Sequence, residues 1–191
     1  MKLTILVLML FYSLMYCDQT VWSYDLTTLP EGWSSTGGWE FDSTGAHIYI
    51  QAIGADGNHS IYTEMLYVPE GTDSVTLSVP QYIHGGGSDG AAYASFTVNL
   101  NEEDPLTLWS HTWYDTWGTD SEPIVESVVV APGDSLSFYF GCDVFAYGSF
   151  GFAELWWYLN DLELVLHGDI QVLKNVSWGL LKTLSYQDSV W

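Results

Sequence analysis

Residues 152–168, FAELWWYLNDLELVLHG, decide the fold class. The second half of this stretch alternates between two sets of side chains: Leu162, Leu164 and Leu166 against Glu163, Val165 and His167. A period of two places one face of a β-strand on a core. The aromatic residues 156–158 ahead of it fit the pleated, half-buried surface of a sheet. The stretch therefore predicts a long, deeply packed strand late in an all-β domain.

Similar period-two segments, bounded by glycine and proline turns, recur along the chain. The clearest are residues 73–83 and 135–141, and further candidates are residues 93–100, 106–114 and 124–130. This spacing predicts an all-β domain with two antiparallel sheets packed as a jelly-roll sandwich of about ten strands.

The N-terminal residues 1–16, MKLTILVLMLFYSLMY, have one lysine followed by an apolar run, which is typical of a secretory signal peptide. The run is shorter than the ~20 residues that a membrane-spanning helix needs. We expect a signal peptide at residues 1–23, cut after Ser23 or after Cys17, a β-sandwich domain at residues 24–167 and a C-terminal tail at residues 168–191. The mature protein is then secreted, extracellular or at the cell surface, with no membrane span after cleavage.

The charge balance is strongly acidic. There are 24 acidic residues against 3 lysines and no arginine, which gives a formal net charge of −21. Such a surface repels phosphate backbones and anionic headgroups, so nucleic acid and anionic membrane surfaces are not expected as partners. The acidic residues serve solubility outside the cell or bind cations, and composition leaves both interpretations open.

The two cysteines do not define a disulfide framework. Cys142 lies in an apolar run, so we expect a buried free thiol. A disulfide to Cys17 requires that Cys17 survive processing.

Several segments carry a resemblance to a known family. They are residues 24–26 (YDL), 29–33 (LPEGW), 68–71 (VPEG), 131–136 (APGDSL) and 158–162 (YLNDL). Together they resemble the cleaved-adhesin or choice-of-anchor jelly-roll modules of bacterial surface and secreted proteins. The resemblance implies an extracellular sandwich used for adhesion or carbohydrate contact, often with a structural calcium ion.

The calcium that this resemblance implies has three candidate ligands, Asp161, Asn160 and Asp25. They lie near the two ends of the domain, where the first and last strands of such modules run side by side. Calcium takes oxygen ligands, including aspartate carboxylates and asparagine carbonyls. This chain has Asn160 where the family tends to have an aspartate, which weakens the site. The alternative is that these residues form a polar turn or bulge.

One segment is a candidate ligand-binding surface, residues 106–118, LTLWSHTWYDTWG. In a strand, one side would carry Trp109, His111, Trp113, Asp115 and Trp117. Indoles stack on the apolar faces of pyranose rings, while imidazole and carboxylate groups hydrogen-bond sugar hydroxyls. We therefore predict a carbohydrate-binding aromatic face for a polysaccharide or surface glycan. In the competing interpretation, Trp109 and Trp113 belong to the core.

No catalytic residues are expected, and the function predicted is that of a binding or adhesive module. The first alternative is a jelly-roll glycoside hydrolase, for which Glu64 and Glu154, the acids most deeply set in apolar sequence, are the candidate pair. A retaining enzyme would need two carboxyls about 5–5.5 Å apart. The second alternative is a purely structural surface protein.

Overall fold

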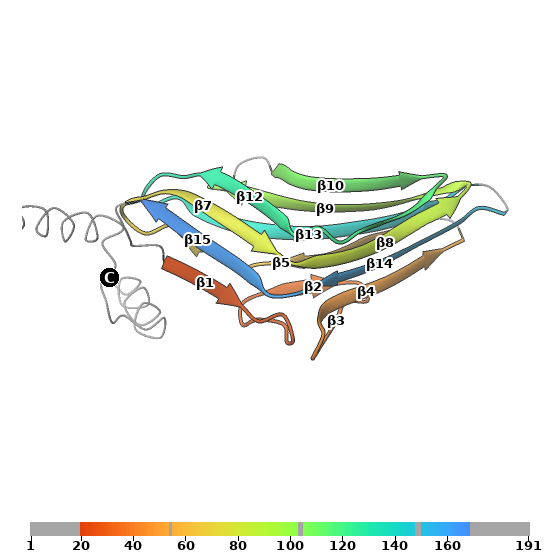
Figure 1. The fold of residues 1–191 in the computed structure, drawn as a ribbon, viewed down its shortest axis with the longest axis horizontal. Helices are drawn as coiled ribbons and strands as arrows, with labels where there is room; N and C mark the ends of the chain where they lie inside the picture. Colours follow the sequence, from red (N-terminus) through yellow and green to blue (C-terminus); the bar gives the residue numbers. More distant parts are fainter. Residues whose placement is uncertain (1–19, 54, 103–104, 148–149, 169–191) are drawn as a thin grey trace, which may run out of the picture.

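The computed structural model describes residues 20–53, 55–102, 105–147 and 150–168. Within these ranges all helix and strand structure is β, and each paired strand is antiparallel to its neighbours (Figure 1). The prediction of an all-β antiparallel sandwich is confirmed. The described residues form fifteen strands rather than about ten, because long strands are interrupted and short edge strands are added.

One layer is a six-stranded sheet built on the longest strand, β13 (Ser135–Ala146). On one side β13 pairs with β9 (Gly90–Leu100), which pairs with the edge strand β10 (Leu106–Tyr114). On the other side β13 pairs with β5 (Ala55–Tyr62), and β5 pairs with β2 (Ser34–Thr36). The first residues of β13 also pair with β6 (Leu66–Tyr67).

The other layer consists of two ladders whose strands continue into one another. The five-stranded sheet has the order β11 (Trp117–Asp120), β8 (Gln81–Ser88), β14 (Phe152–Leu159), β4 (Gly45–Ala52), β3 (Glu40–Asp42). The four-stranded sheet has the order β1 (Thr20–Tyr24), β15 (Leu162–Gly168), β7 (Thr72–Val79), β12 (Ile124–Val129). Because β7 leads into β8 and β14 into β15, the two ladders lie end to end (Figure 1).

The break between the two ladders falls at Pro80 and at Asn160-Asp161. Proline has no N–H to donate to a ladder, so it interrupts a central strand. The backbone N–H of Asn160 donates to the carbonyl of Pro80 with an N···O distance of 2.9 Å, which holds the two breaks beside each other. The predicted strands at residues 73–83 and 152–168 are therefore each two strands in line.

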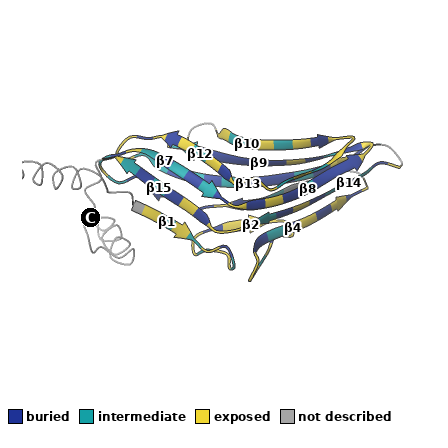
Figure 2. Cartoon of the chain, viewed as in Figure 1, coloured by how far each residue is buried: buried dark blue, intermediate teal, exposed yellow. Residues whose placement is uncertain are grey.

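The core lies between the layers, and the alternation of buried and exposed residues is visible along most strands (Figure 2). Leu162, Leu164 and Leu166 are fully buried, as the sequence predicts. Trp157 is also fully buried, packs edge-on against Phe140 with ring centroids 6.2 Å apart, and is one of the largest side chains in the core. Complete burial of each such side chain contributes about 1.5–3 kcal/mol to folding.

Cys142 is a buried free thiol on β13, as predicted, and its Sγ donates to the carbonyl of His59. Burial raises the pKa of this thiol far above its ordinary value, so it stays protonated and unreactive.

The predicted domain boundaries lie partly outside the described residues. This applies to residues 1–19 of the expected signal peptide and to residues 169–191 of the expected tail. Thr20–Tyr24 form β1, which pairs with Leu162–Leu166 of β15, so the first and last described strands run side by side. Within the part of the chain that the structure describes, no helix is long and apolar enough to cross a membrane.

Candidate functional site

The predicted strand at residues 106–114 exists as β10, but its tryptophans point inward. Trp109, His111 and Trp113 do share a face, because they pair with Phe96, Ala94 and Ala92 of β9. That face is turned to the core: Trp113 is only 4% exposed, and Trp109 stacks on the buried Trp157 with centroids 5.8 Å apart. A bulge between Thr107 and Trp109 sets this register.

Asp115 and Trp117 do not continue that row. Asp115 lies in the turn between β10 and β11 with φ +48°, a left-handed conformation that aspartate tolerates better than most residues. Its carboxylate accepts a hydrogen bond from Gly90 N–H, with an N···O distance of 3.0 Å, so it shapes the turn. Trp117 follows on β11 in the other layer and is 44% exposed.

The five residues predicted to bind sugar therefore do not form one exposed face. An edge strand of a sandwich presents one side to the core, and large aromatic side chains gain most by occupying that side. The stacking of His111 on Trp113, with centroids 4.1 Å apart, belongs to this inner side. His111 also lies 3.6 Å from the carboxylate of Asp120 on β11, which ties the two layers together at this edge.

Two of the three predicted calcium ligands, Asp161 and Asp25, have hydrogen-bond partners in the chain. The carboxylate of Asp161 accepts from Leu26 N–H at 3.4 Å, and that of Asp25 accepts from Thr27 N–H at 2.8 Å. Hydrogen bonds from Thr27 lower the pKa of Asp25. Among the described residues no group of three or more His, Cys, Asp and Glu side chains could hold a metal ion. The backbone hydrogen bonds to Asp161 and Asp25 are those expected of the polar-turn alternative, and the calcium site stays a prediction from the resemblance.

A different surface gathers exposed aromatic residues, namely the outer side of the five-stranded sheet. We call it the aromatic face; its members are Tyr49 on β4, Tyr82 and His84 on β8, Trp117 on β11, and Trp156 and Tyr158 on β14. They share this side because they alternate with core residues such as Ile48, Ile83, Leu155 and Trp157.

Strand register makes the aromatic face continuous. Trp156 pairs with His84 on one neighbouring strand and with Tyr49 on the other. The rings of Tyr49 and Trp156 have centroids 4.1 Å apart, those of Tyr82 and Tyr158 are 6.2 Å apart, and Trp117 stacks on His84 at 6.0 Å. Tyr82 is 46% exposed, Tyr49 and Trp117 are each 44% exposed and Trp156 is 38% exposed, so partly exposed rings extend across four strands.

Polar groups are interleaved with these rings. Tyr49 Oη–H donates to Oε2 of Glu154, which lies on the same side of β14, with an O···O distance of 3.3 Å. Burial, and next to it the charge of Glu154, raises the pKa of Tyr49. Nδ1 of His84 lies 3.1 Å from Oγ1 of Thr119. The face can therefore stack on flat apolar groups and hydrogen-bond hydroxyls at its edges.

The carboxyl pair considered for hydrolysis is not brought into one cleft. Glu154 lies on the outer side of β14. Glu64 follows β5 of the opposite layer, where it lies close to Gly32. Burial, and after it the charge of Glu64, raises the pKa of Tyr24.

Sequence reasoning included Trp117 but missed the other members of the aromatic face. The signal was present: Tyr49 lies between Ile48 and Ile50, and Trp156 between Leu155 and Trp157. Once the aliphatic residues are assigned to the core, the aromatic residues between them fall on the outer side.

Comparisons with known proteins give a distant likeness in fold only. No protein-family model matches the chain, and no curated protein does, so the resemblance to cleaved-adhesin modules finds no match there. Similar solved structures include the xylan-binding module CBM22-1 of a Paenibacillus barcinonensis protein. The two sequences are 15% identical, the match covers 78% of this chain and 96% of that chain, and the TM-score is 0.40. Another is the C-terminal family 6 carbohydrate-binding module of a laminarinase from Zobellia galactanivorans. It is 12% identical, the match covers 76% of this chain and 98% of that chain, and the TM-score is 0.36. A third is a family 36 carbohydrate-binding module in complex with calcium and xylotriose. It is 15% identical, the match covers 75% of this chain and 98% of that chain, and the TM-score is 0.30.

Proposed function

We propose that this protein is a non-catalytic carbohydrate-binding module that holds polysaccharide on its aromatic face. The observation that carries the proposal is the row of partly exposed rings His84, Trp156 and Tyr49, which Trp117 extends onto a fourth strand by stacking on His84. Soluble proteins seldom expose so many large aromatic rings side by side unless the surface binds something. Pyranose rings stack on such rings through their apolar faces, while Glu154 and Thr119 hydrogen-bond the hydroxyls.

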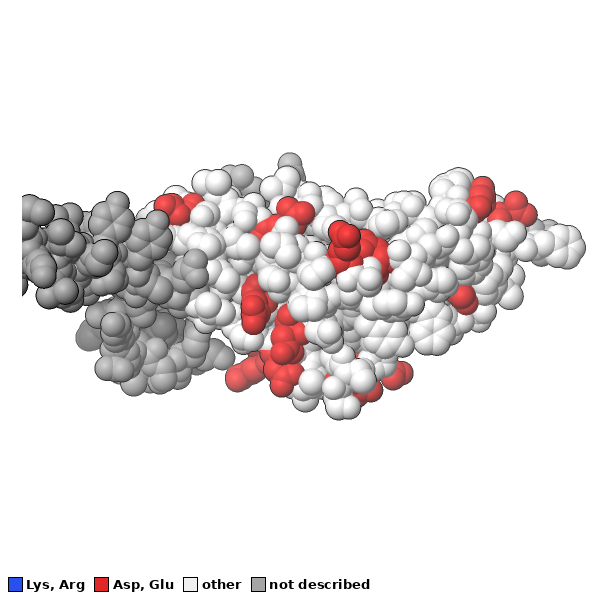
Figure 3. All heavy atoms as spheres, viewed as in Figure 1, with Lys and Arg blue, Asp and Glu red and all other residues white. Residues whose placement is uncertain are grey.

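The charge of the protein narrows the ligand class to uncharged glycans. The described residues include no lysine or arginine, and Figure 3 shows carboxylates spread over one side of the molecule. A sulfated, phosphorylated or uronic-acid polysaccharide would be repelled by the negative charge of this surface. Neutral polysaccharides carry no such penalty, because stacking and hydroxyl hydrogen bonds need no countercharge.

We also propose that binding takes place outside the cell, at a surface or after secretion. The support is the lysine followed by an apolar run in residues 1–16. Outside the cell, a module of this kind attaches the protein that contains it to a glycan.

The test is affinity electrophoresis in gels containing neutral polysaccharides, such as xylan, laminarin, galactomannan or xyloglucan. We expect the wild type to be retarded by at least one of them. The double variant Trp117→Ala, Trp156→Ala should lose retardation while keeping a cooperative thermal transition. Tyr67→Ala, which removes an exposed ring in the other layer, is the matched control. Equal retardation of the double variant and the wild type would place binding elsewhere.

A further inference from the structure

A row of side chains crosses the strands on the outer side of the six-stranded sheet. Thr107 on β10 pairs with Thr97 on β9, which pairs with Tyr139 on β13. Tyr139 pairs in turn with Tyr62 on β5. Thr97, Tyr139 and Tyr62 face away from the core, because they alternate with fully buried residues such as Phe96. The sheet register therefore brings two hydroxyls and two phenol rings from four separate strands into one line.

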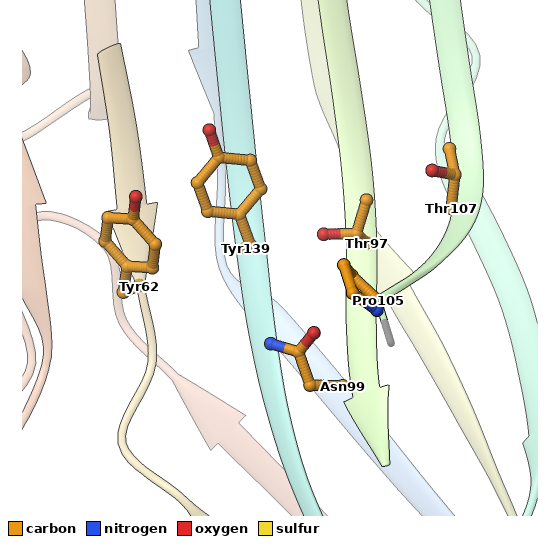
Figure 4. A pocket seen from close by; sticks show the side chains of 6 residues that line it. All are labelled: Tyr62, Thr97, Asn99, Pro105, Thr107 and Tyr139. Atoms are coloured by element: carbon orange, nitrogen blue, oxygen red, sulfur yellow. The ribbon is translucent and has the colours of Figure 1, made fainter. Parts of the chain in front are cut away.

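A cavity of about 310 Å³ lies over this row. Figure 4 shows the side chains that line it: Tyr62, Thr97, Asn99, Pro105, Thr107 and Tyr139. The two tyrosines lie on one side and Thr107 on the other, with Thr97 and Asn99 between them. Ligand pockets span roughly 300–1,000 Å³, so this cavity is at the small end of the range. Its size suits a ligand of one ring rather than an extended chain.

Two phenol rings form the wall on the β5 and β13 side. The rings of Tyr62 and Tyr139 have centroids 4.8 Å apart and planes inclined by 53°. The Tyr139 ring packs against Gly141, because a Cβ placed on that glycine would collide with the ring. Burial, and after it the neighbouring Tyr62, raises the pKa of Tyr139 to about 12, so its phenol is uncharged at neutral pH. The wall therefore offers aromatic surface without charge.

The polar group at the floor is the hydroxyl of Thr97. The Thr97 side chain lines the cavity and the residue is only 8% exposed, yet no other described residue hydrogen-bonds its hydroxyl. The hydroxyl of Ser60, on the same side of the sheet, does have a partner, Thr36, with an O···O distance of 2.8 Å. A buried hydroxyl without a partner costs about 1–3 kcal/mol. Thr97 is thus placed to bond whatever fills the cavity.

Asn99 and Thr107 add to this hydrogen-bonding capacity. Asn99 lies two residues after Thr97 on the same side of β9, and its Nδ2 donates to Oγ of Ser137 with an N···O distance of 3.2 Å. Its carbonyl oxygen accepts no hydrogen bond from the residues that the structure describes, and the Thr107 hydroxyl likewise has no partner among them. The cavity therefore combines aromatic surface with three polar groups that can bond a ligand, and none of its lining residues is charged.

We propose that this cavity is a second carbohydrate site, which holds one uncharged pyranose ring at a chain end or a side branch. The sugar packs its apolar face on the tyrosine wall, while Thr97, Asn99 and Thr107 hydrogen-bond its hydroxyls. An aromatic ligand without hydroxyls would fill the same space but leave these polar groups without partners. The inference goes beyond the proposed function, because it rests on other residues and on a single sugar instead of a chain.

The cavity and the aromatic face belong to different layers. β13 and β14 contact each other through the core, the cavity is on the outer side of the sheet that contains β13, and the aromatic face is on the outer side of the sheet that contains β14. The two sites can therefore be filled independently. The affinity of the cavity should change little with chain length, because one ring fills it, whereas the aromatic face spans four strands.

The experiment is an NMR titration of the protein, labelled at Cζ of tyrosine, with neutral monosaccharides such as glucose, galactose, mannose and xylose. The signals of Tyr62 and Tyr139 are assigned with Tyr62→Phe and Tyr139→Phe. We expect at least one sugar to shift both signals in a saturable way. The signal of Tyr67, which is exposed on β6 and does not line the cavity, should stay in place.

Thr97→Val tests the hydroxyl at the floor, because it keeps the shape of the side chain. Binding should weaken by about three- to tenfold, the loss expected for one hydrogen bond. The melting temperature should stay the same or rise, because the hydroxyl has no partner among the described residues. Thr107→Val, at an exposed position of the cavity rim, should weaken binding by a similar factor. Thr112→Val, the same change at an exposed position of β10 outside the cavity, is the matched control and should not alter binding.

The outcomes separate this site from the aromatic face. If no neutral monosaccharide shifts Tyr62 and Tyr139 while polysaccharide still retards the wild type, the cavity proposal is overturned and the aromatic face stands. Unchanged binding in both Thr97→Val and Thr107→Val overturns it too, because the sugar then lies elsewhere. A response to phenol but to no sugar shows that the ligand class is wrong. Saturable shifts without retardation by any polysaccharide overturn the proposed function and leave the cavity site in place.

Discussion

Tyr49 and Trp156 lie opposite each other on β4 and β14, with ring centroids 4.1 Å apart and ring planes inclined by 36°. The hydroxyl of Tyr49 donates to Glu154 on the same strand as Trp156, so one carboxylate positions the ring beside the indole. This arrangement fixes two neighbouring stacking surfaces at the centre of the aromatic face.

The first prediction follows from that contact. Burial is the first cause that raises the pKa of Tyr49, and the charge and the hydrogen bond of Glu154 follow it. In Glu154→Gln the pKa of Tyr49 should therefore fall toward its ordinary value of about 10 but stay above it, because the cause due to burial remains. NMR titration of tyrosine labelled at Cζ measures this. Glu163→Gln, the same change on β15, is the control. An equal shift of Tyr49 in both variants would mean that net charge, not the local contact, is responsible.

The second prediction separates the two tryptophans that the sequence placed on one face. Trp113→Ala should lower the free energy of unfolding by about 3–5 kcal/mol, because the indole is buried and packs against Gly85 and Gly118. Trp117→Ala should cost much less, because its ring is nearly half exposed, yet it should weaken glycan retention. Urea denaturation and affinity electrophoresis measure the two effects. Similar unfolding costs for both variants would contradict the placement of Trp113 in the core.

Trp113 and Trp117 also show what the sequence can and cannot predict. A period of two correctly groups Trp109, His111 and Trp113, because side chains alternate on any strand. It does not say which side of the strand meets the core. That depends on the strand's position at the edge of the six-stranded sheet, which is set by pairing with β9. The fold class could be predicted because alternation and turns are local, whereas the aromatic face requires strands distant in sequence to pair.

The interrupted strands show the same limit. The alternation of residues 73–83 continues across Pro80 and predicts one strand, although a proline in a central strand is itself a signal of interruption, and the ladder divides there. The same holds for β14 and β15, although the Asn160-Asp161 pair marks the position. The cavity lined by Tyr62, Tyr139 and Thr97 could not be predicted at all, since these residues come from three separate segments that only the sheet register aligns.

The third prediction concerns alkaline pH. Burial, followed by the charge of Glu64, raises the pKa of Tyr24 to about 12, and burial with the neighbouring Tyr62 raises that of Tyr139 to about 12. Unfolded tyrosine ionises near pH 10, so the folded state holds these protons more tightly than the unfolded state does. The resulting stability is complete below about pH 10 and is lost as pH rises toward 12. We expect the melting temperature to fall over this window, and to fall less steeply in Tyr24→Phe. Parallel curves for the two proteins would contradict the assignment to Tyr24.

The last prediction concerns β1, the edge strand that the expected cleavage after Ser23 would divide. Val21, Trp22 and Ser23 pair with Val165, Leu164 and Glu163 of β15, and Trp22 packs against the core. A form that begins at Tyr24 loses these ladder hydrogen bonds and uncovers one edge of β15, whereas a form that begins at Thr20 keeps them. Loss of the half-buried Trp22 alone should cost about 2 kcal/mol, and an unpaired edge strand favours association between molecules. We therefore expect the shorter form to unfold at lower urea concentration and to self-associate, as measured by urea denaturation and light scattering.

Cleavage after Cys17 leaves β1 whole, so N-terminal sequencing of secreted protein should find a start before Thr20. Equal stability of the two forms would show that β1 is dispensable, and a secreted protein that starts at Tyr24 would contradict the expected start before Thr20.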